Sequence, residues 1–297
     1  MTQLKYLIKR NSKLFFKDKG MFITSLITPL ILLVLYISFL GDVYRDAFAL
    51  SIPAGFKVTD VALDAAVSAQ LFASLLAVSC ITVSFCANML MVQDKANRTI
   101  LDLTVSPIKH STLALGYYIS ALLSTLIICA VACFATFIYI ATIGWFLTPL
   151  DILLIFLDIF LLVMLGTALS SVINFFLSTQ GQISAVGTIV SSGYGFISGA
   201  YMPISQISPV LQRVIMFLPG TYGTALLKKH CMRGAFEKIG ECGIPAEVIE
   251  TIKDSIDCNL YFFDKPVSEL TMYAILTTSI ALLIAIYIIL NVKKSNK

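Results

Sequence analysis

Residues 71–93 read LFASLLAVSCITVSFCANMLMVQ, a stretch that contains no Asp, Glu, Lys or Arg. A helix of about twenty apolar residues is long enough to cross the hydrocarbon core of a bilayer. Within lipid, every backbone amide and carbonyl must find its partner inside its own segment, so a run of this length forms a helix. The stretch therefore predicts a membrane-spanning helix.

The same pattern recurs along the chain. Other uncharged runs lie at 21–40, 111–150, 159–212 and 270–292, and turn chemistry interrupts the two longest. We expect six spans, at 21–40, 70–92, 113–140, 151–177, 182–200 and 270–292.

Composition supports this fold class. Apolar residues make up 58% of the chain, charged residues 13%, and the mean hydropathy is +0.90. A soluble domain carries roughly 25% charged residues, so a soluble protein is excluded. Nothing alternates over ten residues as barrel strands do. The sequence therefore predicts an all-α, polytopic membrane protein.

Basic residues predict the orientation of the spans. The side that holds both termini and the 94–107 segment carries twelve basic and three acidic residues, against nine and twelve on the other side. Short cytoplasmic segments carry the excess of Lys and Arg, so both termini are predicted to be cytoplasmic, in the plasma membrane. The alternative, signal-peptide cleavage near Ala47-Phe48-Ala49, is disfavoured because the basic region is too long and the apolar run has full spanning length.

Residues 1–20 are predicted to be a separate interfacial helix, followed by one six-span domain over 21–297. Four lysines recur every fourth residue and share one helical face, with apolar residues opposite: Lys5, Lys9, Lys13 and Lys17 against Leu4, Leu7, Ile8, Leu14 and Phe15. A basic amphipathic helix of this kind lies in the membrane plane against anionic headgroups. The alternative is a solvated basic tail.

Two connections, 41–69 and 201–269, are predicted to be external loops. The second begins with an apolar segment, 204–227, that prolines interrupt, which predicts re-entrant or interfacial half-helices before the last span. A short helical cap is expected at 247–256. This loop also holds Cys231, Cys242 and Cys258, which would form either one disulfide with one thiol left over or three free thiols.

The fifth span carries small residues at a spacing of four, Gly187, Ser191, Gly195 and Gly199. Such a stripe lets helix backbones approach closely in lipid. It would serve packing within the subunit, or it would face a second subunit or a transport pathway.

Asp158 stands out within the membrane, seven residues after Asp151 and on the same helical face. An intramembrane carboxylate is a functional hypothesis by default, and the alternative is a hydrogen-bonded or protonated group near the outer headgroups. Asn88 and Asn174 are expected to make interhelical hydrogen bonds.

Several chemical motifs are missing from the sequence. It has no G-x-x-x-x-G-K-[ST] phosphate loop, no H-E-x-x-H and no paired-cysteine metal motif. Neither histidine, His110 or His230, has a partner at triad spacing. We therefore expect no catalytic residue, no metal and no cofactor bound by this chain.

The loop between the second and third spans is the most informative segment. Asp94 or Asn97 is predicted to cap a short helix that ends at Pro107. Its apolar side would comprise Ile100, Leu101, Leu103 and Val105. A charged helix that joins two spans in the cytoplasm is suited to act as a lever on a soluble partner.

This segment resembles the coupling region of the ABC-2 family of ABC-transporter permeases, whose pattern is acidic-x-x-x-Gly-Thr…Leu…(Ser/Thr)-Pro. Arg98 stands where the family usually has Gly, and five residues fit the pattern, Asp94, Thr99, Leu103, Ser106 and Pro107. A second match is ISGAYMPI at 197–204, followed by Pro209-Val210-Leu211 and LPGTY at 218–222.

The resemblance implies a dimer of permease copies, identical or related, with two cytoplasmic ATPase subunits that hold ATP and Mg²⁺. The helix at 94–107 would dock into an ATPase groove, with Leu101 and Leu103 as anchors and Lys95, Arg98 and Asp102 at the rim. The implied coupling residues are Asp94, Lys95, Arg98, Thr99, Leu101, Asp102, Leu103, Ser106 and Pro107. Partners are then an ATPase, a second permease copy and lipids, with no nucleic acid.

The leading hypothesis for function is an exporter of an amphiphilic drug, a peptide antibiotic or a lipid-linked substrate. Sodium-type ion extrusion by the same architecture is an alternative. A channel or secondary transporter that is not coupled to ATP would require several ionisable residues or broken helices at mid-membrane, and a membrane scaffold or immunity protein would give no reason for the charged Ser-Pro lever.

Overall fold

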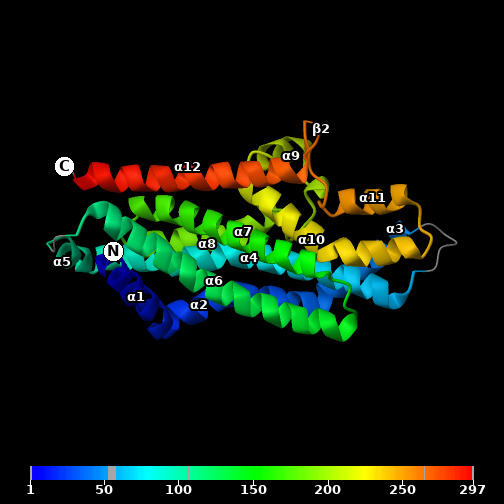
Figure 1. Cartoon of the computed structure of the whole chain (residues 1–297), viewed down its shortest axis with the longest axis horizontal. Helices are drawn as coiled ribbons and strands as arrows, with labels where there is room; N and C mark the ends of the chain where they lie inside the picture. Colours follow the sequence, from blue (N-terminus) through cyan, green and yellow to red (C-terminus); the bar gives the residue numbers. More distant parts are fainter. Residues whose placement is uncertain (1, 53–57, 106–107, 264, 296–297) are drawn as a thin grey trace.

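The computed structural model describes residues 2–52, 58–105, 108–263 and 265–295 (Figure 1). Of the chain, 85% is helical, which confirms the all-α fold class. In chain order the elements are α1 (Thr2–Lys17), α2 (Lys19–Leu35), the π-helix η1 (Tyr36–Leu40), α3 (Gly41–Ser51), α4 (Asp60–Ala96), α5 (Thr99–Val105), α6 (His110–Ile143), α7 (Pro149–Phe176), α8 (Gln180–Ile197), the 3₁₀ turn η2 (Ile204–Gln206), α9 (Pro209–Ile215), α10 (Pro219–Glu241), α11 (Ala246–Ser255), β1 (Tyr261–Phe262), β2 (Lys265–Pro266) and α12 (Glu269–Ser295).

The long helices run side by side along one axis. The start of α1, the end of α12 and α5 lie at one end of this axis, the α5 end, and α3 and α11 lie at the other, the α11 end (Figure 1). Ser106 and Pro107, expected to close the 94–107 segment, lie outside the described residues.

Among the described residues, four helices are long and apolar enough to cross a membrane, α4, α6, α7 and α12. The pair α1 and α2, bent by 72° between Lys17 and Lys19, makes a fifth if it is counted as one span. The fifth expected span, α8, has 18 residues. Its many small and polar side chains make its mean hydropathy too low for it to be counted with these helices. Its crossing of the membrane stays a prediction.

The central helix of the bundle is α4, which contacts α2, α6, α7, α8 and α10. Its Ala, Ser and Cys residues are small enough to let neighbouring helices approach closely. Where α7 crosses it, a Cβ on Gly166 would lie 3.0 Å from Ser84 Oγ and 3.1 Å from the Cys80 carbonyl oxygen. Glycine at this position therefore lets the two helices approach closely.

Side-chain hydrogen bonds join α4 to α7, as expected for Asn88 and Asn174. The Asn88 amide donates to Ser170 Oγ at 3.0 Å and to Ser171 Oγ at 2.7 Å. The Asn174 amide donates back to the Asn88 carbonyl at 3.2 Å. The prediction of interhelical bonding is confirmed.

The region 41–69 is not an open loop. Helix α3 occupies its first part, and α4 begins at Asp60, ten residues before the expected start of the second span. Arg45 of α3 joins the two helices, because its guanidinium lies 2.8 Å from an Asp60 carboxylate oxygen and 3.1 Å from one of Asp64. Paired charges allow these hydrophilic residues to continue the helices beyond the apolar runs.

The amphipathic N-terminal segment forms α1, but part of its apolar side packs against α6. Leu7 and Phe15 are buried, and Leu7 lies directly over Gly116, where an added Cβ would be 3.0 Å from the Leu7 Cβ. Tyr6 remains 69% exposed. The helix thus has a remaining apolar surface, and its location at the membrane interface stays a prediction.

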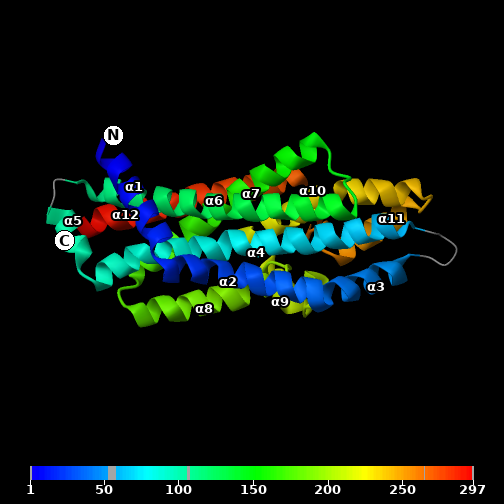
Figure 2. The ribbon, with the colours of Figure 1, turned by 90° about the horizontal axis from the view of Figure 1, so that it is seen from below.

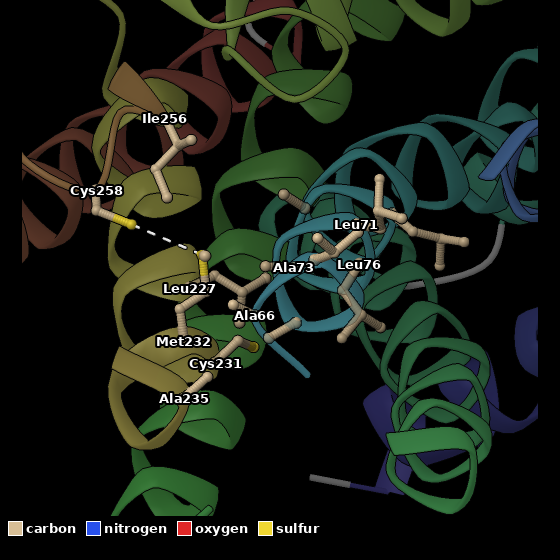
Figure 3. Packing of buried hydrophobic residues seen from close by; sticks show 14 of the residues in the cluster. Ala66, Leu71, Ala73, Leu76, Leu227, Cys231, Met232, Ala235, Ile256 and Cys258 are labelled. Atoms are coloured by element: carbon tan, nitrogen blue, oxygen red, sulfur yellow. Dashed lines mark hydrogen bonds between the residues drawn. The ribbon is translucent and has the colours of Figure 1, made fainter. Parts of the chain in front are cut away.

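The segment 201–269 forms the half-helices that its prolines predicted. Pro209 and Pro219 begin α9 and α10, where a missing N–H costs nothing. The loop expected to follow these half-helices is not a loop at 228–241, which complete α10. This half packs on α4 and α7, with Cys231, Met232 and other residues in the core (Figure 3). The expected cap is present as α11.

Candidate functional site

The expected coupling segment divides into the end of α4, a tight turn and α5. Asn97 ends α4, and its N–H donates to the Gln93 carbonyl at 2.9 Å. Arg98 has a φ of 61°, in the left-handed region that side chains with a Cβ rarely adopt. This is the position where the family pattern has glycine, so the turn requires the conformation that glycine adopts most easily.

Asp94 does not cap α5, because it lies within α4 and is buried. Arg10 of α1 donates to its two carboxylate oxygens at 2.9 and 3.2 Å, and the Tyr117 hydroxyl of α6 donates to it at 2.6 Å. One carboxylate thus joins three helices at the α5 end. Its expected place as the cap of the short helix is corrected to a position inside α4 that fixes this helix against α1 and α6.

Lys95 is not a solvated rim charge either. Its ammonium group donates to the carbonyls of Asn174 at 2.9 Å, Phe175 at 2.7 Å and Leu177 at 3.2 Å. These carbonyls end α7, where backbone acceptors lack helical partners and the dipole is negative. Lys95 therefore caps α7 from the neighbouring helix.

The apolar residues of α5 face two ways. Ile100 and Leu103 pack against the core cluster at the α5 end, and Thr99 is half-buried beside them. Leu101 is 56% exposed and Val105 is 88% exposed. Leu103 is therefore wrong as an outward anchor, and the side of α5 that faces away from the bundle presents Leu101 and Val105, beside the exposed Arg98 and Asp102.

A cleft of about 1070 Å³ runs between α2, α4 and α8, which lie next to one another in Figure 2. One wall is α2, with apolar side chains such as Ile27 and Ile31. The opposite wall is α8, with Ser184 and Thr188, and Met89 of α4 lines the cleft between them. The cleft thus has a mostly apolar wall on α2, which also carries Thr24 and Thr28, and a wall on α8 rich in hydroxyl groups.

The small-residue stripe of α8 divides between this cleft and internal packing. Gly187 and Ser191 line the cleft. Gly195 lies under the Tyr201 ring, and Gly199 has a φ of 71° and closes the turn after α8. Half of the stripe therefore serves packing within the subunit, and the other half lines the cleft; whether that half faces a second subunit or a pathway stays a prediction.

Asp158 is buried and fully bonded near the α11 end of α7. Its carboxylate lies 2.6 Å from His230 Nδ1 of α10 and accepts from the Tyr273 hydroxyl of α12 at 2.7 Å. Sequence reasoning missed this partner, because His230 is 72 residues away and was assigned to an external loop. Its sequence neighbours gave no signal, since they include the basic residues Lys228, Lys229 and Arg233. The geometry supports the structural alternative for Asp158.

Lys228 holds the turn after α8 against the α11 cap. Its ammonium group is buried and donates to the carbonyls of Gly199 at 2.6 Å and Ile256 at 2.9 Å, and it lies 3.6 Å from Asp257. Burial raises the pKa of Asp257, while the Lys228 charge opposes that rise. This arrangement is a structural support rather than a reactive site.

The three cysteines of segment 201–269 are free thiols. Cys258 lies against Met232, with 3.9 Å between the sulfur atoms (Figure 3). Burial raises the pKa of its thiol to about 12, so at neutral pH the group is the unreactive thiol. Of the two alternatives, the structure contains the one with three thiols.

A helical membrane bundle with a long cleft and a short helix outside the spans defines a membrane component of the transport class. The chain belongs to the ABC-2 type transporter family, whose profile matches residues 2–229. No curated protein matches it significantly in sequence. It is therefore a transmembrane component of an ABC transporter, a class that works with an ATPase partner.

Proposed function

We propose that this chain is the permease subunit of an ABC exporter in the plasma membrane, with α5 and both termini in the cytoplasm. The positive-inside distribution of Lys and Arg supports this orientation. ATP and Mg²⁺ are held by separate ATPase subunits, and this chain supplies the path through the membrane.

The cleft between α2, α4 and α8 carries the proposal. Its volume, about 1070 Å³, is at the upper end of the roughly 300–1,000 Å³ typical of pockets for drug-sized ligands. An amphiphile would place its apolar part against Ile27, Ile31 and Leu35 of α2 and its polar part against the hydroxyls of α8. This chemistry favours an amphiphilic drug, a peptide antibiotic or a lipid-linked molecule as cargo.

A second permease copy, identical or related, would complete the path. The outer sides of α2 and α8 bear exposed apolar residues such as Val34, Ile189 and Ile197, which are 62%, 68% and 40% exposed. Small residues on α8 favour close approach of another helix. The proposed dimer places these two helices between the copies.

The exposed side of α5 is the proposed contact with the ATPase. It offers the apolar pair Leu101 and Val105 with Arg98 and Asp102 beside them. The bonds of Asp94 and Lys95 fix the end of α4, so a push on α5 is transmitted to α1, α6 and α7. That arrangement supports coupling between nucleotide binding and the bundle.

The test compares the same substitution at two glycines of α8. In Gly187→Leu the new side chain enters the cleft, where its Cβ meets only the flexible end of Met89 at 3.0 Å. In Gly193→Leu the new Cβ has nothing within 4 Å, and the residue does not line the cleft. We expect Gly187→Leu to abolish ATP-driven export of a fluorescent amphiphile from vesicles that contain the ATPase, and Gly193→Leu to retain it.

Both variants should co-purify with the ATPase, which shows that the complex is intact. Equal export by the two variants would contradict the proposed pathway.

A further inference from the structure

A second apolar surface lies outside the cleft, on α9 and the β1–β2 hairpin. Val210 is 77% exposed, Phe217 65% and Phe263 58%. Phe217, Phe262 and Phe263 contact one another edge-on, with ring centroids 4.8 to 6.4 Å apart. We call the surface formed by Val210, Arg213, Val214, Phe217, Phe262 and Phe263 the aromatic pad.

The pad is held rigidly, although it buries little of its apolar surface. The Gln212 amide donates to the Ser205 and Ile207 carbonyls at 3.2 and 2.7 Å, and the Tyr222 hydroxyl donates to the Met216 carbonyl at 2.6 Å. Of α9, only Ile215 is buried. The apolar side of this helix is thus turned outward and kept there by hydrogen bonds to backbone on its other side.

Phe263 adds to this arrangement. Its φ of 46° lies in the left-handed region, which a bulky side chain adopts only at an energetic cost. Strain of this kind persists where the surroundings hold a residue in place, and it is more frequent at functional surfaces. At Phe263 the strained backbone places the ring beside those of Phe217 and Phe262.

The position of the pad identifies its surroundings. It lies next to the start of the α12 span, where Leu270 is 82% exposed, at the end of α12 far from its C-terminus. Figure 1 shows α9 and β2 projecting sideways from the bundle there, rather than capping its end. Tyr and Trp are enriched where hydrocarbon meets headgroups, and Tyr261 lies beside the pad. This position favours the bilayer interface as the phase next to the pad.

A hollow of about 230 Å³ lies between α9 and the hairpin, and it is suited to one headgroup. Arg213 lines it together with Met216 and Phe262, and none of the described residues that line it is acidic. Arg213 forms no ion pair with another described residue. A guanidinium group matches the geometry of a phosphate, and the surrounding rings match the apolar stem of a lipid.

We propose that the aromatic pad is a phospholipid-binding surface that lies in the headgroup region of the leaflet at the α11 end, with Arg213 on a lipid phosphate. The proposal requires only that α12 spans the bilayer. It involves neither cargo nor ATPase, so it succeeds or fails separately from the export function.

The first experiment measures the depth of the pad in vesicles of phosphatidylcholine that contain the full chain. The chain has one tryptophan, so Trp145→Phe combined with Phe263→Trp places a single fluorophore on the pad, and Phe217→Trp gives a second variant. We expect stronger quenching by nitroxide lipids labelled near the headgroup than by lipids labelled at the chain end, and little quenching by iodide. The unaltered chain is the control, because its single tryptophan, Trp145 between α6 and α7, reports the quenching of a residue outside the pad.

Two outcomes would overturn the proposal. Quenching by iodide without quenching by lipid would place the pad in water. If neither iodide nor the nitroxide lipids quench the fluorophore, and quenching appears only when the chain is diluted in lipid, the pad would lie against a second copy.

The second experiment tests the phosphate contact with vesicles that contain phosphatidylglycerol. Arg213→Gln should lower the preference for the anionic lipid about fivefold, the effect of losing one cation near the membrane surface. Lys265→Gln, which removes an exposed cation of the same hairpin that does not line the hollow, should change it less. An unchanged preference in Arg213→Gln would remove the phosphate site from the proposal.

Discussion

Two parts of the bundle contain similar small and polar residues but are held in different ways. In the frame, formed by α4, α7 and α10, the Asn88 side chain bonds across to Ser170 and Ser171 of another helix. In the wall, formed by α2 and α8, the hydroxyls of Thr188 and Ser192 bond to the carbonyls four residues earlier in their own helix. Polar side chains therefore join helices in the frame, whereas the hydroxyl groups of Thr188 and Ser192 in the wall bond only within their own helix.

This difference indicates which part can shift. Within lipid, helix association depends on packing and on polar bonds between helices. Among the described residues, the hydrogen bonds that leave α8 are few and long, such as that of the Tyr194 hydroxyl to the Gly220 carbonyl at 3.4 Å. A transport cycle requires an element with two arrangements, and we expect the wall to move along a frame that stays intact.

The largest effect is expected when the proposed contact between α5 and the ATPase is removed. The double variant Leu101→Asp with Val105→Asp should retain membrane insertion, because both side chains are exposed outside the spans. Truncating a central contact costs about 2 kcal/mol or more of binding, so we expect the ATPase to be lost on purification and transport to cease. The measurement is the ratio of co-purified ATPase to permease.

Two single variants control this experiment. Asp102→Asn alters an exposed charge and should cost at most ~1 kcal/mol. Lys95→Glu should reduce assembly and transport more than the loss of an exposed rim charge does. It replaces the donor to three carbonyls of α7 with a negative group. Full assembly and transport in the double variant would refute the assignment of α5 as the coupling helix.

A second prediction breaks the frame at the α11 end. Asp158→Ala would leave the buried His230 ring and the half-buried Tyr273 hydroxyl without their partner. Each such loss costs about 1–3 kcal/mol, so we expect the unfolding free energy to fall by roughly 3 kcal/mol. Asp158→Asn, which keeps one acceptor, should lose about half as much. Thermal unfolding in detergent measures both, and unchanged stability in Asp158→Ala would show that the cluster does not support the frame.

The smallest expected effect tests directly whether the frame and the wall are held differently. Asn88→Ala removes bonds between α4 and α7, each worth about 0.6 kcal/mol in a membrane bundle, so a loss of about 1–2 kcal/mol is expected. Thr188→Val keeps the shape of the side chain and removes only a bond within α8, so its stability should change by less than ~0.5 kcal/mol. Equal losses in the two variants would mean that frame and wall are held alike.

Much of the fold could be predicted because lipid restricts the backbone. The runs at 70–92, 113–140 and 270–292 each lie within a helix, and the run at 151–177 extends one residue past the end of α7. In hydrocarbon, a single segment can satisfy its own backbone only as a helix. Pro209 and Pro219, the first residues of α9 and α10, were equally direct signals of where these helices begin. The helical ends of 41–69 and the second half of α10 were missed, because their charges are paired with distant residues, as Arg45 is with Asp60.

The candidate site was predicted in part. The pattern around Arg98 and Thr99 located the turn and α5 correctly. The roles of Asp94, Lys95 and Leu103 were not predictable, because each depends on a neighbour from another helix. The cleft also depends on three separate segments, and the small residues of α8 alone allowed two readings.

By itself, the sequence determined that this chain is a helical membrane protein, where its helices run and which short segment lies outside the spans. Only the tertiary structure decided which side of each helix faces the core, the cleft or the lipid. The physical reason is that lipid and core are both apolar, so a spanning helix lacks the polar stripe that orients a helix in water. The burial of Asp158 against His230, the central place of α4 and the outward face of the aromatic pad all follow from packing between segments far apart in the chain.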